Sequence, residues 1–182
     1  MSNPFYTIGH STRSIAEFTD LLVQAGVETV VDVRTVPRSR TNPQFNRDTL
    51  PETLSQFQVG YEHVSALGGL RKKCPQTAPE VNALWRVQSF HNFADYALGA
   101  PFRCALTELR VLGGGRRCAI MCAEAMWWRC HRRIIADYLI AAGERVLHIV
   151  ANKRIEPARM TEGAMVHPDG TVTYPAQGGD LL

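Results

Sequence analysis

The sequence predicts an α/β fold, in which a mainly parallel sheet is flanked by helices in a Rossmann-like three-layer arrangement and followed by a small C-terminal β-hairpin. Apolar, β-branched runs of strand length alternate along the chain with segments of helical periodicity. A strand, a helix and a second strand follow one another within the first 33 residues, which is typical of a βαβ unit. At 182 residues the chain can bury one sizeable core, so we expect one α/β domain over 1–182, with its core at about 5–150 and a hairpin and tail at 151–182.

The N-terminal unit consists of a strand at 5–8, a helix, and a strand at 29–33. Ser14 is the expected N-cap of the helix, and Glu17, three residues later, completes a capping box. Gly26 follows the last periodic residue and is expected to end the helix. The two strands are expected to form a parallel pair joined by a right-handed crossover.

The middle of the chain begins with a long loop at 34–48 that is rich in arginine and contains two prolines. Most connections are about 4–6 residues long, so a loop of this length is either functional or mobile. The elements expected after it are a short helix at 50–57, a strand at 61–67, helices at 81–98 and 102–112, a flexible glycine connector at 113–115, a strand at 118–121, a helix at 128–142 and a last parallel strand at 145–150. A hairpin with Asp169-Gly170 at its turn and a frayed end at 177–182 complete the prediction.

The charge of the chain is nearly balanced overall but unevenly distributed. A formal net charge of +3 is too small to argue for nucleic-acid binding by itself. However, seven basic residues lie between Arg34 and Lys73 against three acidic ones, and seven arginines lie between Arg103 and Arg133 against two acidic residues. These segments indicate either a positive face suited to an anionic ligand or a solvated arginine surface.

The cysteines and the N-terminal residues indicate in which cellular compartment the protein is expected. The five cysteines are odd in number and irregularly spaced. The first residues lack the charged and apolar regions of a signal peptide, and no apolar stretch approaches the roughly 20 residues of a membrane helix. We therefore expect a cytoplasmic protein with reduced thiols and no membrane contact.

Polar, small and reactive residues follow the expected strands. Because the carboxyl ends of parallel strands meet at one edge of a sheet, these residues are expected to form one site. They are His10, Ser11, Asp32, Arg34, Gly68, Gly69, Cys122 and Glu124.

Cys122 lies between an expected strand and an expected helix, where the helix N-terminus and Arg129 could favour a thiolate. Phosphatase and rhodanese loops place an arginine after five intervening residues, in a loop of small residues. Here six residues intervene, and the loop contains the bulky residues 126–128. The spacing therefore favours an inert cysteine at the end of a strand over a nucleophile.

Cys122, Cys130 and His131 could supply soft metal ligands, but the chain has no Cys-x-x-Cys pair of the kind that zinc sites usually show. Cys130 and His131 are adjacent, so on a helix their side chains would diverge by about 100°. We therefore predict no metal site, and expect His131 to donate a hydrogen bond near the sheet.

The carboxylates and arginines leave two interpretations open. Glu124 and Asp32 could act as general acid and base, or each could pair with an arginine and be structural. Five arginines could bind phosphate or carboxylate in bidentate fashion: Arg34, Arg38, Arg40, Arg129 and Arg132. Trp127 and Trp128 could stack on a base, although one of them is expected to pack the helix against the sheet.

The candidate catalytic residues are Glu124, Cys122 and Asp32, and the candidate ligand-binding residues are His10, Ser11, Arg34, Ser39, Arg40, Gly68, Gly69, Arg129, His131 and Arg132.

Several short motifs occur in a specific order. They are Ile8-Gly9-His10-Ser11, Asp32-Val33-Arg34 with Pro37, Ser39 and Arg40, Tyr61 and His63, Leu67-Gly68-Gly69, Cys122-Ala123-Glu124, Cys130-His131-Arg132, and Gly143 with Val146, His148 and Ile149. Over roughly 5–150 the chain resembles the family known as domain of unknown function 488. The resemblance implies a common α/β fold and a shared site, with no agreed reaction. In that family a polar loop leads to the Cys-His-Arg motif, whereas residues 126–128 make it apolar here, which predicts a different ligand preference.

The leading functional hypothesis is an enzyme that acts on an anionic or nucleotide-like ligand. In it Arg34, Arg129 and Arg132 bind the anion and Glu124 is the general acid or base, while His10, Ser11 and Cys122 line the pocket. One alternative is a nucleic-acid-binding module that uses five basic residues: Arg38, Arg40, Arg71, Lys72 and Lys73. A zinc protein is the third hypothesis. The sequence predicts neither a cofactor nor an oligomeric state.

Overall fold

The computed structural model describes residues 2–178, and within them six strands form one sheet. Their order is β3-β2-β4-β1-β5-β6, and all pairings are parallel except that of β5 with β6. The strands are β1 (Phe5–Gly9), β2 (Thr29–Asp32), β3 (Gly60–His63), β4 (Cys118–Cys122), β5 (Val146–Ala151) and β6 (Arg154–Pro157). The predicted α/β class and its mainly parallel sheet are confirmed.

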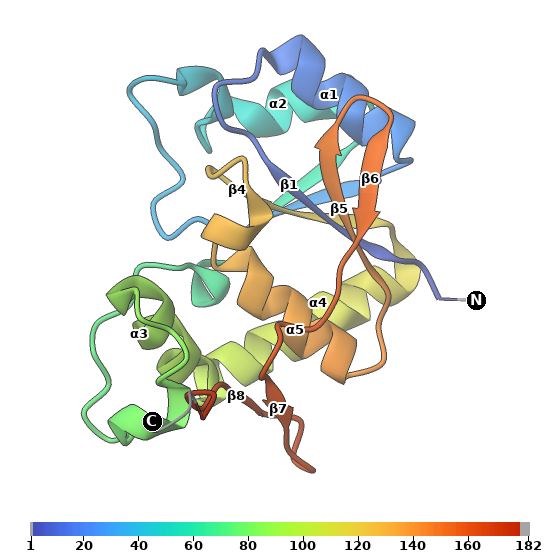
Figure 1. The fold of residues 1–182 in the computed structure, drawn as a ribbon. Coiled ribbons are helices and arrows are strands. Elements are labelled where there is room, and N and C mark those ends of the chain that lie inside the picture. Colours follow the sequence, from blue (N-terminus) through green and yellow to red (C-terminus); the bar gives the residue numbers. More distant parts are fainter. Residues whose placement is uncertain (1, 179–182) are drawn as a thin grey trace.

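Helices cover both faces of the sheet. Figure 1 shows α1 (Ile15–Gln24) and α2 (Leu50–Ser55) on one side, and α4 (Ala100–Gly115) and α5 (Arg132–Ala141) on the other. The helix α3 (Gln88–Ala97) packs against α4.

Successive side chains of a strand point to opposite faces of the sheet, and this alternation produces the two apolar layers. In β1, Tyr6 and Ile8 belong to the apolar cluster that includes α1 and α2, whereas Phe5 belongs to the cluster that includes α3, α4 and α5. The strands read as nearly continuous apolar runs because both faces of a parallel sheet are buried.

The helix α1 follows the predicted start and end signals. Ser14 Oγ accepts a hydrogen bond from the backbone N–H of Glu17 at 3.1 Å, and Gly26 adopts φ 67° just beyond the helix. The second hydrogen bond of a capping box would run from the backbone N–H of Ser14 to the Glu17 carboxylate. Here that carboxylate accepts from the guanidinium of Arg13 instead. The N-cap itself is confirmed.

The first two strands are parallel but not neighbours, so the predicted pair is wrong in this respect. The strand β4 lies between them, and Ala119 pairs with Tyr6 on one side and with Val30 on the other. The chain therefore leaves a gap between β1 and β2 and fills it about ninety residues later. Local sequence signals do not report such an insertion.

Several predicted boundaries also differ. The expected strand at 61–67 ends at His63, and one 3₁₀ turn follows it at Ser65–Leu67. The expected helix at 81–98 begins only at Gln88, because 79–82 form a separate 3₁₀ turn. The antiparallel strand β6 was not predicted.

The triple glycine at 113–115 is not a connector but the last turn of α4. A Cβ atom on Gly113 would lie 2.2 Å from the ring of Phe5, so the helix can pack on β1 only with glycine there. The expected helix at 128–142 is split as well: a 3₁₀ turn covers Trp127–Arg129, and α5 begins at Arg132.

The C-terminal hairpin is confirmed as β7 (Met165–Val166) and β8 (Val172–Thr173), with Asp169 and Gly170 between them. Tyr174 follows it into the core, where its hydroxyl donates to Asp137 Oδ2 at 2.8 Å. Residues 179–182 of the predicted frayed end lie outside the described residues. Among the helices of residues 2–178, none combines the length and the apolar character that a membrane span requires.

Candidate functional site

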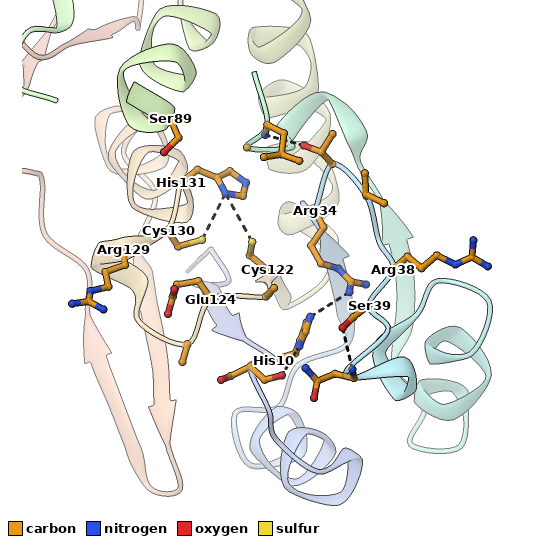
Figure 2. Close-up of a pocket in the computed structure, with 18 of the residues that line it drawn as sticks. His10, Arg34, Arg38, Ser39, Ser89, Cys122, Glu124, Arg129, Cys130 and His131 are labelled. Carbon is orange, nitrogen blue, oxygen red and sulfur yellow. Dashed lines mark hydrogen bonds between the residues drawn. The ribbon is translucent and has the colours of Figure 1, made fainter. Parts of the chain in front are cut away.

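A cavity of about 650 Å³ lies at the carboxyl ends of β1, β2 and β4. Residues from five separate segments line it: His10, Ser11 and Thr12 after β1; Arg34, Thr35, Val36, Arg38, Ser39 and Asn42 after β2; Gly69 and Leu70; Ser89 and Phe90; and Cys122, Ala123, Glu124, Ala125, Arg129, Cys130 and His131. The cavity therefore lies at the strand ends at which the sequence places the candidate site. Figure 2 shows its labelled side chains around a common centre.

Most of the predicted site residues line this cavity. Those that do are His10, Ser11, Arg34, Ser39, Gly69, Cys122, Glu124, Arg129 and His131. Four other predicted residues are placed behind it or away from it: Asp32, Arg40, Gly68 and Arg132.

Asp32 is fully buried and is committed to a hydrogen-bond network. Its Oδ1 accepts from the backbone N–H of Arg34 at 3.0 Å and from Arg34 Nε at 2.9 Å. Its Oδ2 accepts from Arg34 Nη2 at 2.7 Å and from the hydroxyl of Tyr61. Burial, reinforced by the Asp32 carboxylate, raises the pKa of Tyr61 and keeps it a donor. Asp32 therefore organises the loop after β2 rather than facing the cavity.

Arg34 is shared between this network and the cavity. Its Nη2 also donates to the carbonyl of Phe45 at 2.7 Å, and its Nη1 donates to His10 Nε2 at 3.3 Å. Burial opposes its charge, but the bonds to Asp32 outweigh that effect and raise the pKa of Arg34. Only 6% of its side chain is exposed, so it presents a fixed positive charge at the cavity wall.

His10 is held as a neutral imidazole. Its Nδ1 faces the carbonyl oxygen of Ser11 at 2.9 Å, so Nδ1 carries the proton and Nε2 accepts from Arg34. The ring stacks on Phe45 with centroids 4.4 Å apart. Burial lowers the pKa of His10, and the positive charge of Arg34 acts in the same direction.

Two thiols and an imidazole meet on the opposite wall. The Nε2 of His131 is 3.0 Å from the carbonyl oxygens of both Val33 and Leu67, so Nε2 carries the proton. The Nδ1 lone pair then faces Cys130 Sγ at 3.6 Å and Cys122 Sγ at 3.9 Å (Figure 2). The predicted hydrogen bond from His131 near the sheet is confirmed.

The argument that Cys130 and His131 must diverge is wrong, because neither lies inside the helix. Cys130 ends the 3₁₀ turn in extended conformation, and α5 starts at Arg132. The two sulfurs and Nδ1 of His131 lie within 4.8 Å of one another. Among the described residues, these three form a group that could hold a metal ion.

Arg132 supports this wall from behind. It is 1% exposed, and its backbone N–H and Nε lie 3.5 and 3.3 Å from Cys130 Sγ. Its Nη2 donates to the carbonyl of Glu124 at 2.6 Å, and its Nη1 donates to Thr7 Oγ1 at 3.3 Å. Arg132 thus ties the end of β4 to the start of α5 and does not reach the cavity.

The two thiols differ in acidity. Burial opposes ionisation of Cys130, but hydrogen bonding from Cys122 and the charge of Arg132 outweigh it, so the pKa of Cys130 lies well below its usual range. The pKa of Cys122 is raised well above its usual range, because its hydrogen is engaged by Cys130 and because it is buried.

Two glycines of the recognised motifs make room for this arrangement. A Cβ on Gly9 would lie 1.9 Å from the carbonyl oxygen of Glu124, so β1 can approach the end of β4 only with glycine there. A Cβ on Gly69 would lie 2.6 Å from His131 Nδ1. Gly69 therefore leaves the space that the imidazole occupies.

The rim of the cavity is polar and exposed. The Glu124 carboxylate accepts from the backbone N–H of Met126 at 3.1 Å. Arg38 and Arg129 are exposed and extend outward from opposite sides in Figure 2, so their side chains can turn toward a ligand. Trp127 stacks on His148 with centroids 4.5 Å apart, whereas Trp128 is exposed, as expected for one inward and one outward ring.

A few lining residues were missed. Ser89 and Phe90 come from the start of α3, a segment with no local signal beyond its apolar pattern. Thr35, Val36 and Asn42 lie in the long loop whose length alone indicated function.

A family model described as "Domain of unknown function DUF488" matches residues 14–139. The chain belongs to this family. No curated protein and no solved structure matched the chain in the corresponding comparisons. The DUF488 match contains both walls of the cavity except for the segment after β1, since His10, Ser11 and Thr12 precede it.

Proposed function

We propose that this DUF488 protein is an enzyme whose substrate is an anionic small molecule bound in the cavity. The observation that carries the proposal is the charge of the lining: Arg34, Arg38 and Arg129 contribute to it, and Glu124 is the one acidic side chain among the described lining residues. A low-dielectric wall around a fixed positive charge favours an anion. A cavity of about 650 Å³ is large enough for a nucleotide-sized ligand.

The roles follow from position. Arg34 supplies the fixed charge at the wall, while Arg38 and Arg129 close on the ligand from the rim. Glu124 is the carboxylate that exchanges a proton with the ligand, because it is exposed to the cavity while Asp32 is sealed by Arg34 and Tyr61. Ser11, Ser39 and Asn42 add polar contacts between the two walls.

A binding panel with matched variants tests the proposal. Thermal shift would be measured with inorganic phosphate, pyrophosphate, nucleoside monophosphates, sugar phosphates and dicarboxylates. We expect one class to stabilise the wild type, and Arg38→Ala and Arg129→Ala to weaken that stabilisation. Arg40→Ala is the control, because Arg40 is exposed on the same loop but does not line the cavity. Binding that is lost equally in Arg40→Ala, or is absent for every class, would refute the proposal.

Turnover is tested separately on whichever compound binds. Product formation would be followed by mass spectrometry for the wild type and for Glu124→Gln. We expect the variant to bind the compound but convert it at a rate at least about tenfold lower, because it cannot exchange the proton. Equal conversion by both proteins would remove Glu124 from the mechanism.

The nucleic-acid alternative has one observation in its favour: Arg38, Arg40, Lys72 and Lys73 are exposed on two loops that meet where the Leu70 backbone N–H donates to Thr35 Oγ1. Arg71, however, is committed elsewhere, because it donates to two carbonyls and lies 3.8 Å over the ring of Tyr96. This alternative expects oligonucleotide affinity that falls steeply with salt and is reduced in Arg40→Ala.

A further inference from the structure

We propose that Cys122, Cys130 and His131 form a zinc site in the wall of the cavity, with its fourth coordination position open to the cavity. Nothing in the family description assigns such a site. The inference does not rest on the identity of the anionic ligand, because metal binding is measured without any ligand present.

Two of the three separations between the donor atoms are close to those of tetrahedral coordination. With Zn–S bonds of about 2.3 Å and Zn–N bonds of about 2.0 Å, neighbouring ligand atoms are about 3.5–3.8 Å apart. The His131 Nδ1 lies 3.6 Å from Cys130 Sγ and 3.9 Å from Cys122 Sγ, and all three atoms lie within 4.8 Å of one another. An ion would require movements of a few tenths of an ångström at the first two separations, and the two sulfurs, which lie within 4.8 Å of each other, would approach by up to about 1 Å.

The orientation of His131 is the second argument. Its Nε2–H is held by the carbonyls of Val33 and Leu67, both at 3.0 Å. This leaves the Nδ1 lone pair aimed at the two sulfurs (Figure 2). A ligating histidine almost always donates its other ring N–H to a carbonyl or carboxylate, which fixes the tautomer that binds metal.

The surroundings of the sulfurs suit thiolate ligands. The backbone N–H and Nε of Arg132 point at Cys130 Sγ from 3.5 and 3.3 Å. Such N–H donors stabilise sulfur that carries negative charge, and the buried guanidinium compensates the charge of two thiolates. Gly69 keeps the space beside Nδ1 clear of a side chain.

The number of ligands argues for an open position. Zinc sites that only support a fold usually have four protein ligands, whereas sites that act on substrates have three and keep the fourth position for water or substrate. Here three donors come together, and all three residues line the cavity. Zinc at this point would lower the pKa of a bound water and polarise an anionic ligand held by the arginines.

Direct metal analysis distinguishes a zinc site from two cysteines that bind no metal. The protein would be purified under reducing, anaerobic conditions, loaded with zinc sulfate, dialysed and analysed by inductively coupled plasma mass spectrometry. We expect about one zinc ion per chain. Loading with Co²⁺ should give a thiolate-to-cobalt charge-transfer band and intense visible bands typical of tetrahedral coordination.

Serine substitutions locate the site. Cys122→Ser and Cys130→Ser should each lower zinc affinity by at least about 100-fold, because losing a ligand exceeds the cost of losing an outer-shell partner. Cys104→Ser is the matched control, since Cys104 is exposed on α4, away from the cavity. Circular dichroism would confirm that each variant is folded.

A measurement on the wild type alone keeps the proposal testable if a buried variant does not fold. Zinc should raise the Tm of the wild type and of Cys104→Ser, because an ion that binds the folded state stabilises it. Azide, a small anionic metal ligand, should shift the visible bands of the cobalt protein if the fourth position is open. No metal uptake by the reduced wild type, uptake unchanged in Cys122→Ser, or a Cys122–Cys130 disulfide that forms in place of uptake would each overturn the inference.

Discussion

Two clusters of polar side chains lie on opposite sides of the cavity, and they differ in how fully their hydrogen-bonding capacity is used. In the first, both carboxylate oxygens of Asp32 accept two hydrogen bonds each, and Arg34 donates to a carboxylate, a carbonyl and an imidazole. In the second, Cys130 Sγ accepts from Arg132 and His131 Nε2 donates to two carbonyls, but His131 Nδ1 has only the two sulfurs beside it.

The difference separates groups that build the fold from groups that remain available to a ligand. A buried charge must be paired, so the Asp32–Arg34 cluster is satisfied internally and is costly to disturb. Sulfur and an imidazole nitrogen are weaker hydrogen-bonding groups than a carboxylate and a guanidinium, so they can lie together with fewer partners at lower cost. Asp32 and Arg34 are therefore held in place by the fold, whereas the two sulfurs and Nδ1 of His131 keep more of their capacity for a ligand.

The largest effect is expected from removing one charge of the satisfied cluster. Asp32→Asn keeps the shape of the side chain but leaves Arg34 buried without its carboxylate. Breaking a buried pair in this way costs about 3–5 kcal/mol, so the urea midpoint of unfolding should fall strongly.

The double variant Asp32→Asn with Arg34→Met should recover part of that loss, because it removes the stranded charge as well. If the urea midpoint of Asp32→Asn equalled that of the wild type, the Asp32–Arg34 cluster would not be the costly one to disturb, and the contrast drawn between the two clusters would be wrong.

The second effect is a loss of stability in acid through His148, which is 2% exposed and connects to the cavity wall through Thr7. Burial, together with the charge of Arg132, lowers the pKa of His148 from 6.5 to about 4, although Glu156 opposes the shift. The unfolded chain therefore binds this proton first. The stabilisation is complete above pH 6.5 and is lost as the pH falls toward 4, by about 3 kcal/mol at most.

Unfolding by urea at several pH values between 7 and 4 would measure this loss. His148→Gln should flatten the profile, and the slope that remains should come partly from His10, whose pKa is also lowered by burial. An unchanged slope in the variant would show that His148 is not held neutral.

The fold was predictable where the signal is local. The cap at Ser14, the hairpin turn at Asp169-Gly170 and the parallel strands follow from residue types and periodicity. The insertion of β4 between β1 and β2, and the packing of Phe5 on Gly113, depend on contacts between segments about a hundred residues apart. No local pattern contains that information.

The location of the site was predictable for the same reason that the parallel sheet was, since strand carboxyl ends converge. The contacts of its residues were not. A sequence does not show that the side chain of Arg34 folds back onto Asp32, two residues earlier, while it also lines the cavity. Cys130 and His131 were separated on a helix that begins one residue after His131, so a small boundary error reversed the geometric conclusion.

A smaller effect is expected from filling the space beside the cluster of Cys122, Cys130 and His131. Gly69→Ala places a methyl group 2.6 Å from His131 Nδ1, so the imidazole must move. Overpacking of this kind costs about 1–3 kcal/mol, and zinc uptake should fall because Nδ1 no longer faces the sulfurs. Gly114→Ala is the matched control: its added Cβ meets no atom within 4 Å, and in a helix alanine is favoured over glycine. Equal stability and zinc uptake in the two variants would argue against a packed imidazole.

The smallest effect is expected from Tyr61→Phe, which removes one of the four hydrogen bonds to Asp32 and leaves the three from Arg34 in place. A hydrogen bond to a charged group contributes about 1.5 kcal/mol, so the urea midpoint should fall by roughly a third of the shift seen in Asp32→Asn. Zinc uptake should be unchanged, because Tyr61 touches the Asp32–Arg34 cluster and not the thiols. A loss of zinc in Tyr61→Phe would show that the two walls are coupled, and the distinction between a satisfied and an available wall would then fail.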